Sequence, residues 1–126
     1  MKLPAAVPEI PVSSIDQALA YYVGMLGFTF GWGDEQGGIA GISRGDCRLF
    51  FTNRSFREHY GNTGPMMFWL NLNSKDEVDE LFTEWKAAGA NIVSEPEDKP
   101  WKLREFTASD PDGNRIRVFY DFHWDV

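Results

Sequence analysis

The chain has 126 residues, a hydrophobic fraction of 43% and a formal net charge of -7. This length and composition predict one domain with enough apolar side chains for a core, and they exclude global disorder. The acidic balance argues against a nucleic-acid partner, which needs a basic stripe on one face, and mildly favours cationic ligands.

Cysteine content and hydropathy bear on the compartment. The single Cys47 excludes an internal disulfide, so nothing indicates an oxidising compartment. The first residues contain one lysine and several prolines, and their apolar run is too short for a signal peptide. No segment reaches the length of a membrane span. We therefore expect a cytoplasmic protein with no membrane partner.

Two helices are predicted from the same pattern of residues. A capping box begins at Ser14 in the sequence SIDQ, apolar residues follow at helical spacing, and Gly27 can supply the left-handed residue that ends a helix. The second capping box begins at Ser74 in SKDE, and Gly89 is the matching stop. The two starts and the two stops have nearly the same separation, which indicates an internal repeat.

One strand-like run precedes each helix and about three follow it, with Gly, Asn, Asp and Pro turns between them. The runs lie near residues 7–12, 28–32, 38–43 and 47–52, and then near 66–72, 90–94, 102–109 and 115–122. The fold class predicted is α+β with two βαβββ repeats in a single domain, 1–126. Repeat one covers about 5–53, a loop-like linker about 54–64, and repeat two about 65–123. Two such sheets side by side would cup a cavity with the faces that their helices leave free.

The last strand carries an unexpected charge. Residues 110–114, DPDGN, have strong turn chemistry, and alternation in the strand after them puts Ile116 and Val118 on one face. That face suits a core. The other face holds Arg117 and Phe119, so it mixes charge with an aromatic ring.

These features resemble the vicinal oxygen chelate superfamily, which includes glyoxalase I, extradiol dioxygenases and bleomycin-resistance proteins. The stretches that carry the resemblance are SIDQALAYYVGMLGF, ISRGDCRLFF and PWKLREFTASDPDGNRIRVF. Together they extend over nearly the whole chain. They identify a superfamily and not an activity.

The resemblance implies where a metal would be held. Metal-dependent members place four ligands on the inner faces of the first, fourth, fifth and eighth strands. The matching positions here are Val7, Phe50, Met67 and Arg117, and none is a metal ligand. The permanent charge of an arginine would also repel a divalent cation. We therefore expect no metal and no other cofactor.

Within the metal-free branch, the closest resemblance is to bleomycin-resistance proteins, which sequester a drug in grooves of a homodimer. In those proteins an aromatic group stacks on the flat part of the drug. The resemblance implies that Trp101 is the best candidate for this stacking role and that Trp69 is the second. The positions near Ile39 and Met67 carry fewer aromatic side chains than a dedicated stacking site would have. The ligand here can therefore differ from bleomycin.

Strand alternation and loop position give the wider set of candidates. The expected ligand-binding residues are Trp32, Phe50, Met67, Trp69, Trp101, Arg117 and Phe119. Each aromatic residue has an alternative role in packing the core or an interface. Arg117 has an alternative too, as the ion-pair partner of Glu9, Asp121 or Glu105. The acidic stretch EPEDKP can be a solvated loop or the border of a groove.

The function predicted is metal-free binding of a small aromatic or cationic, antibiotic-like molecule of the bleomycin type, by sequestration in a homodimer. No nucleophile motif or phosphate loop is present, so we expect no catalytic residue. One alternative is a metal-dependent enzyme of the glyoxalase or dioxygenase kind with non-standard ligands. Another is a subunit or sensor whose partner contacts replace the ligand.

Overall fold

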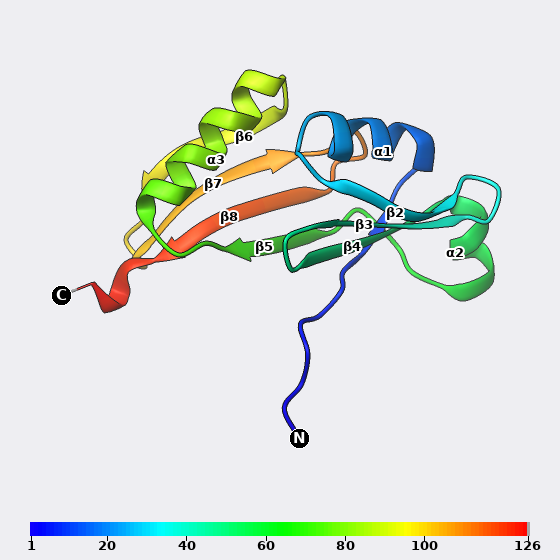
Figure 1. The fold of residues 1–126 in the computed structure, drawn as a ribbon, viewed down its shortest axis with the longest axis horizontal. Helices are drawn as coiled ribbons and strands as arrows, with labels where there is room; N and C mark the ends of the chain where they lie inside the picture. The colour runs from blue at the N-terminus through cyan, green and yellow to red at the C-terminus, as the bar shows by residue number, and fades with distance from the viewer. Residues whose placement is uncertain (126) are drawn as a thin grey trace. The chain divides into compact units, whose positions relative to one another are not determined.

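The computed structural model describes residues 1–125, and these form two compact units that meet in sequence at Pro65 and Met66. Each unit contains one four-stranded sheet and its helices (Figure 1). The units are described one at a time below.

Unit 1 has the order βαβββ followed by one more helix. Its elements are β1 (Glu9–Pro11), α1 (Ile15–Gly24), β2 (Thr29–Asp34), β3 (Ile39–Arg44), β4 (Cys47–Thr52) and α2 (Arg54–Tyr60). The strand order is β1-β4-β3-β2. β1 runs parallel to β4, and the other pairs are antiparallel.

Unit 2 repeats this design. Its elements are β5 (Met67–Asn71), α3 (Lys75–Ala88), β6 (Asn91–Asp98), β7 (Leu103–Ser109), β8 (Arg115–Asp121) and a final 3-10 turn, η1 (Phe122–Trp124). The order is β5-β8-β7-β6, again with one parallel and two antiparallel pairs. The predicted pair of βαβββ repeats is therefore confirmed.

Both predicted helix starts are confirmed by their caps. The Ser14 hydroxyl accepts from the Gln17 backbone N–H at 3.2 Å, and the Ser74 hydroxyl accepts from that of Glu77 at 3.0 Å. Gly89 ends α3 in the left-handed region, as predicted. The predicted stop at Gly27 is wrong, because α1 already ends at Gly24 and Gly27 takes its positive φ in the connection to β2.

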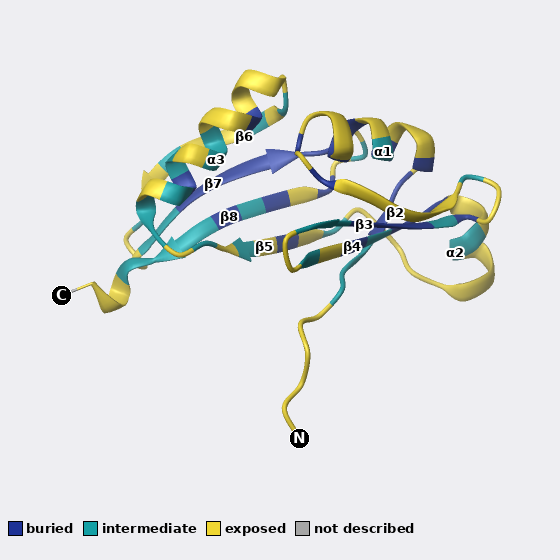
Figure 2. Ribbon diagram, viewed as in Figure 1, coloured by how far each residue is buried: buried dark blue, intermediate teal, exposed yellow. Residues whose placement is uncertain are grey.

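In each unit one sheet face packs on the long helix. In unit 1 the buried side chains of this core include Ile10, Tyr22, Ala40, Leu49 and Phe51. In unit 2 they include Phe68, Val78, Trp85, Phe106, Ala108, Ile116 and Val118. Figure 2 shows the contrast between β7, which is mostly buried, and β2, which is exposed along its length. The faces away from the long helices carry the candidate site residues.

Two predicted loops are regular elements. The linker contains α2, which Asn53 caps through its side chain to the Phe56 N–H at 3.1 Å and which Gly61 ends. The acidic stretch EPEDKP lies largely in β6, which extends to Asp98. Polar composition concealed both elements, because α2 buries no residue fully and β6 is mostly exposed.

The turn at residues 110–114 is fixed by hydrogen bonds of two buried side chains, those of Asp110 and Asn114. Asp110 Oδ1 accepts from the backbone N–H groups of Asp112 and Asn114, each at 2.9 Å. Asn114 donates through Nδ2 to Asp110 Oδ2 at 2.8 Å, and its Oδ1 accepts from Met66 N–H at 2.9 Å. The motif thus joins the β7–β8 turn to the residue that precedes β5.

None of the helices within residues 1–125 is long and apolar enough to cross a membrane.

Candidate functional site

The open face of unit 2, the sheet face away from α3, is set by the alternation of β8. Ile116 and Val118 are fully buried, while Arg117 and Phe119 point to the other side. Strand register aligns Trp69 of β5 and Thr107 of β7 with Arg117, one on each side. Residues that are level across a sheet share a face, so the predicted site residues of β5 and β8 lie together.

Arg117 is the centre of this face. Its guanidinium carbon lies 5.0 Å from the centre of the Trp69 ring, a cation–π arrangement. Its Nη1 lies 3.7 Å from Glu105 Oε1, with side-chain exposures of 30% for Arg117 and 5% for Glu105. Its Nε is buried and has no hydrogen-bond acceptor. Glu105, one of the three carboxylates considered from the sequence, is in contact with Arg117.

Aromatic rings extend the face beside the guanidinium. Trp69 meets Phe119 edge to face, with ring centres 5.5 Å apart and planes at 81°. Trp69 keeps 45% of its surface exposed, and Met67, two residues earlier in β5, is also exposed. This combination gives a stacking surface with one charged donor at its side.

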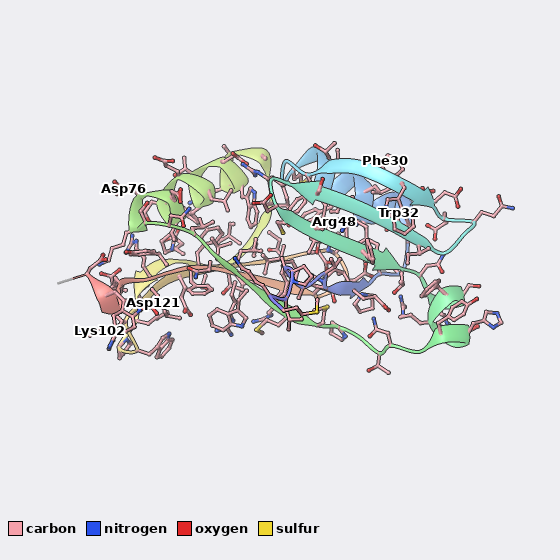
Figure 3. All side chains as sticks on the ribbon, turned by 60° about the horizontal axis from the view of Figure 1, so that its bottom comes forward. Phe30, Trp32, Arg48, Asp76, Lys102 and Asp121 are labelled. Carbon is pink, nitrogen blue, oxygen red and sulfur yellow. The ribbon has the colours of Figure 1, made fainter. Side chains whose placement is uncertain are left out.

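Trp101 reaches the same face from the β6–β7 turn. Its indole Nε1 donates to Glu105 Oε2 at 3.3 Å, and 57% of the residue is exposed. The next residue, Lys102, has a φ of 69°, an uncommon value for a non-glycine residue, and its carbonyl accepts from Phe122 N–H at 3.0 Å. Lys102 and Asp121 lie at the C-terminal end of the unit (Figure 3).

Unit 1 has an open face of similar composition. Phe50 of β4 lies level with Glu9 of β1 and with Gly41 of β3. Trp32 of β2 lies over Gly41 and meets Phe50 edge to face at 5.3 Å. Figure 3 labels Trp32 and Arg48, and the Arg48 guanidinium carbon lies 5.6 Å from the Phe50 ring centre. Both open faces therefore combine an arginine, an edge-to-face aromatic pair and a carboxylate.

The four residues that the resemblance places at the metal-ligand positions carry no metal-binding group. Val7 precedes β1, Phe50 and Met67 belong to β4 and β5, and Arg117 belongs to β8. Among residues 1–125, no group of three or more His, Cys, Asp and Glu side chains could hold a metal ion. His59 lies in α2 and His123 in η1. The residues present do not fit the metal site of the metal-dependent members.

No activated thiol is present among the described residues either. Cys47, at the start of β4, is half-buried, and this burial raises the pKa of its thiol above the ordinary value. A raised pKa leaves less of the thiolate that a nucleophile requires.

Sequence reasoning named Glu105 as one possible partner of Arg117, but it placed neither Glu105 nor Gly41 on an open face. Glu105 contacts both Arg117 and Trp101, but the faces were worked out for the first, fourth, fifth and eighth strands alone. The same alternation applied to β7 would have placed Glu105 and Thr107 on the open face. Gly41 was missed because its role is to leave space for Trp32, which needs the cross-strand register.

The sequence model of the Glyoxalase/Bleomycin resistance protein/Dioxygenase superfamily matches residues 5–118. No curated protein matches the sequence. Lactoylglutathione lyase from Agrobacterium tumefaciens has a similar structure, with a TM-score of 0.79 and 20% identity over 98% of each chain. A glyoxalase/bleomycin resistance protein/dioxygenase from Alicyclobacillus acidocaldarius gives a TM-score of 0.77 and 19% identity, covering 99% of this chain and 98% of that one. One from Nocardioides gives 0.77 and 22%, covering 95% and 85%. At these sequence identities the similarity shows a shared fold, and the activities of the similar proteins are not transferred to this chain.

Proposed function

The chain belongs to the glyoxalase/bleomycin resistance protein/dioxygenase superfamily, and from this premise we propose that it is a metal-free protein that binds a planar aromatic small molecule without modifying it. The observation that carries the proposal is the open face of unit 2. There the guanidinium of Arg117 lies over the exposed Trp69, and its partner Glu105 accepts from the indole of the exposed Trp101. The resemblance places Arg117 where metal-dependent relatives hold a ligand to the metal. Exposed aromatic surface around a few polar groups is the usual composition of a small-molecule site.

Each part of the face has a role in this proposal. Trp69 and Trp101 offer ring faces for stacking, Phe119 supports Trp69, and Met67 adds adaptable apolar surface. Arg117 supplies the polar contact that orients the ligand. On unit 1, Trp32 and Phe50 supply a second aromatic surface of the same kind.

A tryptophan fluorescence titration tests the proposal. Bleomycin and other planar aromatic natural products are added to the wild type, and we expect saturable quenching or a shift of the emission. The Trp69→Phe and Trp101→Phe variants should each lose part of this signal. Trp124→Phe is the matched control, since Trp124 is exposed in η1 and lies outside the face. Absence of any saturable change in the wild type would contradict the proposal.

We further propose that the protein acts as a homodimer, because exposed aromatic side chains favour association. We also propose that it is cytoplasmic, as expected from its single cysteine. Size-exclusion chromatography with light scattering measures the mass directly. A stable monomer at micromolar concentration would contradict the dimer and leave the binding proposal in place.

The alternative is a metal-dependent enzyme of the glyoxalase or dioxygenase kind with ligands in other positions. This alternative is favoured by the structural similarity to a protein from Agrobacterium tumefaciens that is named as an enzyme, lactoylglutathione lyase. Elemental analysis of the purified protein separates the two. A stoichiometric divalent metal, whose removal abolished turnover of a glutathione hemithioacetal or a catechol, would favour the enzyme.

A further inference from the structure

The guanidinium of Arg117 has hydrogen-bond donors that the rest of the described chain does not use. An arginine carries five N–H donors. Within residues 1–125, the side chain of Arg117 makes one ion pair, at 3.7 Å, which is longer than a hydrogen bond, and Nε is buried without an acceptor. Polar N–H groups in proteins are nearly always hydrogen-bonded, and the Arg117 side chain keeps 30% of its surface exposed, so an acceptor from outside the chain can pair with the part of the guanidinium that stays accessible.

The charge around Arg117 restricts what that acceptor can be. Glu105 is almost completely buried next to the guanidinium and balances its charge. The other charged residues of β8 on this face, Arg115 and Asp121, also have opposite signs, and the whole chain has a net charge of -7. An anionic group at Arg117 would therefore approach the Glu105 carboxylate with no net positive charge to attract it. A cationic group would lie against the guanidinium itself.

The ring contacts define the rest of the ligand. The guanidinium lies over Trp69, whose edge-to-face contact with Phe119 supports the orientation of the indole. Trp101 is held to Glu105 through its indole N–H, so the same carboxylate positions both the arginine and the second tryptophan. A flat ring system stacked on Trp69 would bring a substituent close to Arg117.

We propose that this face binds a planar aromatic ligand through an uncharged carbonyl or amide oxygen of that ligand. This oxygen accepts a hydrogen bond from the Arg117 guanidinium. This inference rests on the proposed function and narrows its ligand class to neutral acceptors. Glu105 is the positioning residue, since it neutralises Arg117 and orients Trp101.

An NMR titration with three matched probes tests the inference. 2-Naphthamide, 2-naphthoate and 2-naphthylmethylammonium share one ring system and differ in the charge of the polar group. The indole N–H resonances of Trp69 and Trp101, identified with Trp→Phe variants, report binding at the site, and that of Trp124 serves as the reference. We expect 2-naphthamide to bind about tenfold more tightly than either charged probe, the factor that one charge-assisted hydrogen bond supports.

Arg117→Met supplies the decisive comparison. Methionine keeps an unbranched side chain over Trp69 and removes every donor, and Glu105 then loses its ion-pair partner. We expect the amide to lose its advantage and 2-naphthylmethylammonium to become the tightest of the three. Arg115→Met removes a charge from the same strand and face and should leave the wild-type order unchanged. Circular dichroism of each variant establishes that it is folded.

The outcomes separate this inference from the proposed function. If 2-naphthoate binds the wild type most tightly, or if Arg117→Met leaves the order unchanged, the inference is wrong and aromatic binding on the face stands. If none of the probes shifts the Trp69 or Trp101 resonance, both the inference and ligand binding on this face are overturned. Tightest binding of the amide, lost in Arg117→Met and kept in Arg115→Met, supports the inference.

Discussion

The indole of Trp32 occupies the space that a side chain on Gly41 would need. A Cβ at position 41 would lie 2.3 Å from Trp32 Nε1, and the glycine lies level with Phe50, whose ring meets the indole. Covering a strand glycine with a cross-strand aromatic ring is a recognised way to fix a sheet position. The orientation of Trp32 on the open face of unit 1 thus depends on the absence of a side chain at Gly41.

Gly41→Ala is therefore expected to displace Trp32. The added methyl group forces the indole away from β3, so the tryptophan emission should shift, and the free energy of unfolding should fall by about 1 kcal/mol. Fluorescence and urea denaturation measure the two effects. Gly24→Ala is the matched control, because nothing lies within 4 Å of its added Cβ, and it should leave the emission unchanged. An unchanged emission in Gly41→Ala would contradict the packing described.

Glu105→Gln tests the pairing on the open face of unit 2. The substitution leaves the Arg117 charge without its partner, and we expect the free energy of unfolding at pH 7 to fall by about 1–2 kcal/mol. This value lies below that of a fully buried pair, because Arg117 is partly exposed. Urea denaturation measures it.

The double variant Glu105→Gln/Arg117→Met shows whether the two residues are coupled. Its loss of stability should be smaller than the sum of the single losses, since neither charge is then left alone. Glu95→Gln is the control, because its ion pair with Lys86 is well exposed, and it should change stability by less than about 0.5 kcal/mol. Simple additivity would argue against the pair.

Glu35→Gln should change the pH dependence of stability. Glu35 accepts from Asn53 Nδ2 at 2.8 Å, from the Ser14 hydroxyl at 3.1 Å and from the Asp16 backbone N–H at 3.3 Å. The hydrogen bond from Asn53 is the main reason that the pKa of Glu35 lies below its ordinary value. A lowered pKa stabilises the folded state above the unfolded pKa of about 4.3, and this stabilisation is lost as the pH falls through the folded pKa.

We therefore expect Glu35→Gln to lower the free energy of unfolding by about 1 kcal/mol at pH 7, and we expect this difference from the wild type to shrink as the pH falls below about 4.3. Urea denaturation at several pH values measures the difference. Glu58→Gln serves as control, since the ion pair of Glu58 with Arg54 is well exposed. A difference that stays constant from pH 7 to pH 3 would refute the assignment to the Glu35 carboxylate.

Asn114→Ala should be among the more damaging substitutions of polar residues. It removes the acceptor of Met66 N–H and a donor to Asp110, and both Asp110 and Asn114 are buried. We expect a loss of about 2–3 kcal/mol in the free energy of unfolding, the cost of leaving buried polar groups unsatisfied. Asp46→Ala, at an exposed position of the β3–β4 turn, should cost less than about 0.5 kcal/mol. Equal losses in the two variants would contradict this role of Asn114.

The amino-acid sequence by itself determined the features whose causes are local. Ser14 and Ser74 cap helices within their own turns, Gly89 ends one of them, and the alternation of β8 separates Ile116 from Arg117. These interactions join residues a few positions apart, so their residue types are sufficient to predict them. The repetition of the local pattern then predicted both βαβββ units.

Only the tertiary structure decided the contacts between residues distant along the chain. The selection of Glu105 as partner of Arg117 and the space that Gly41 leaves for Trp32 both depend on strand register. Helix α2 was missed because its residues are polar and mostly exposed, so no apolar periodicity marks it. Register and packing are set by the sheet as a whole, so the contacts on the open faces could not be predicted from the residue types of single strands.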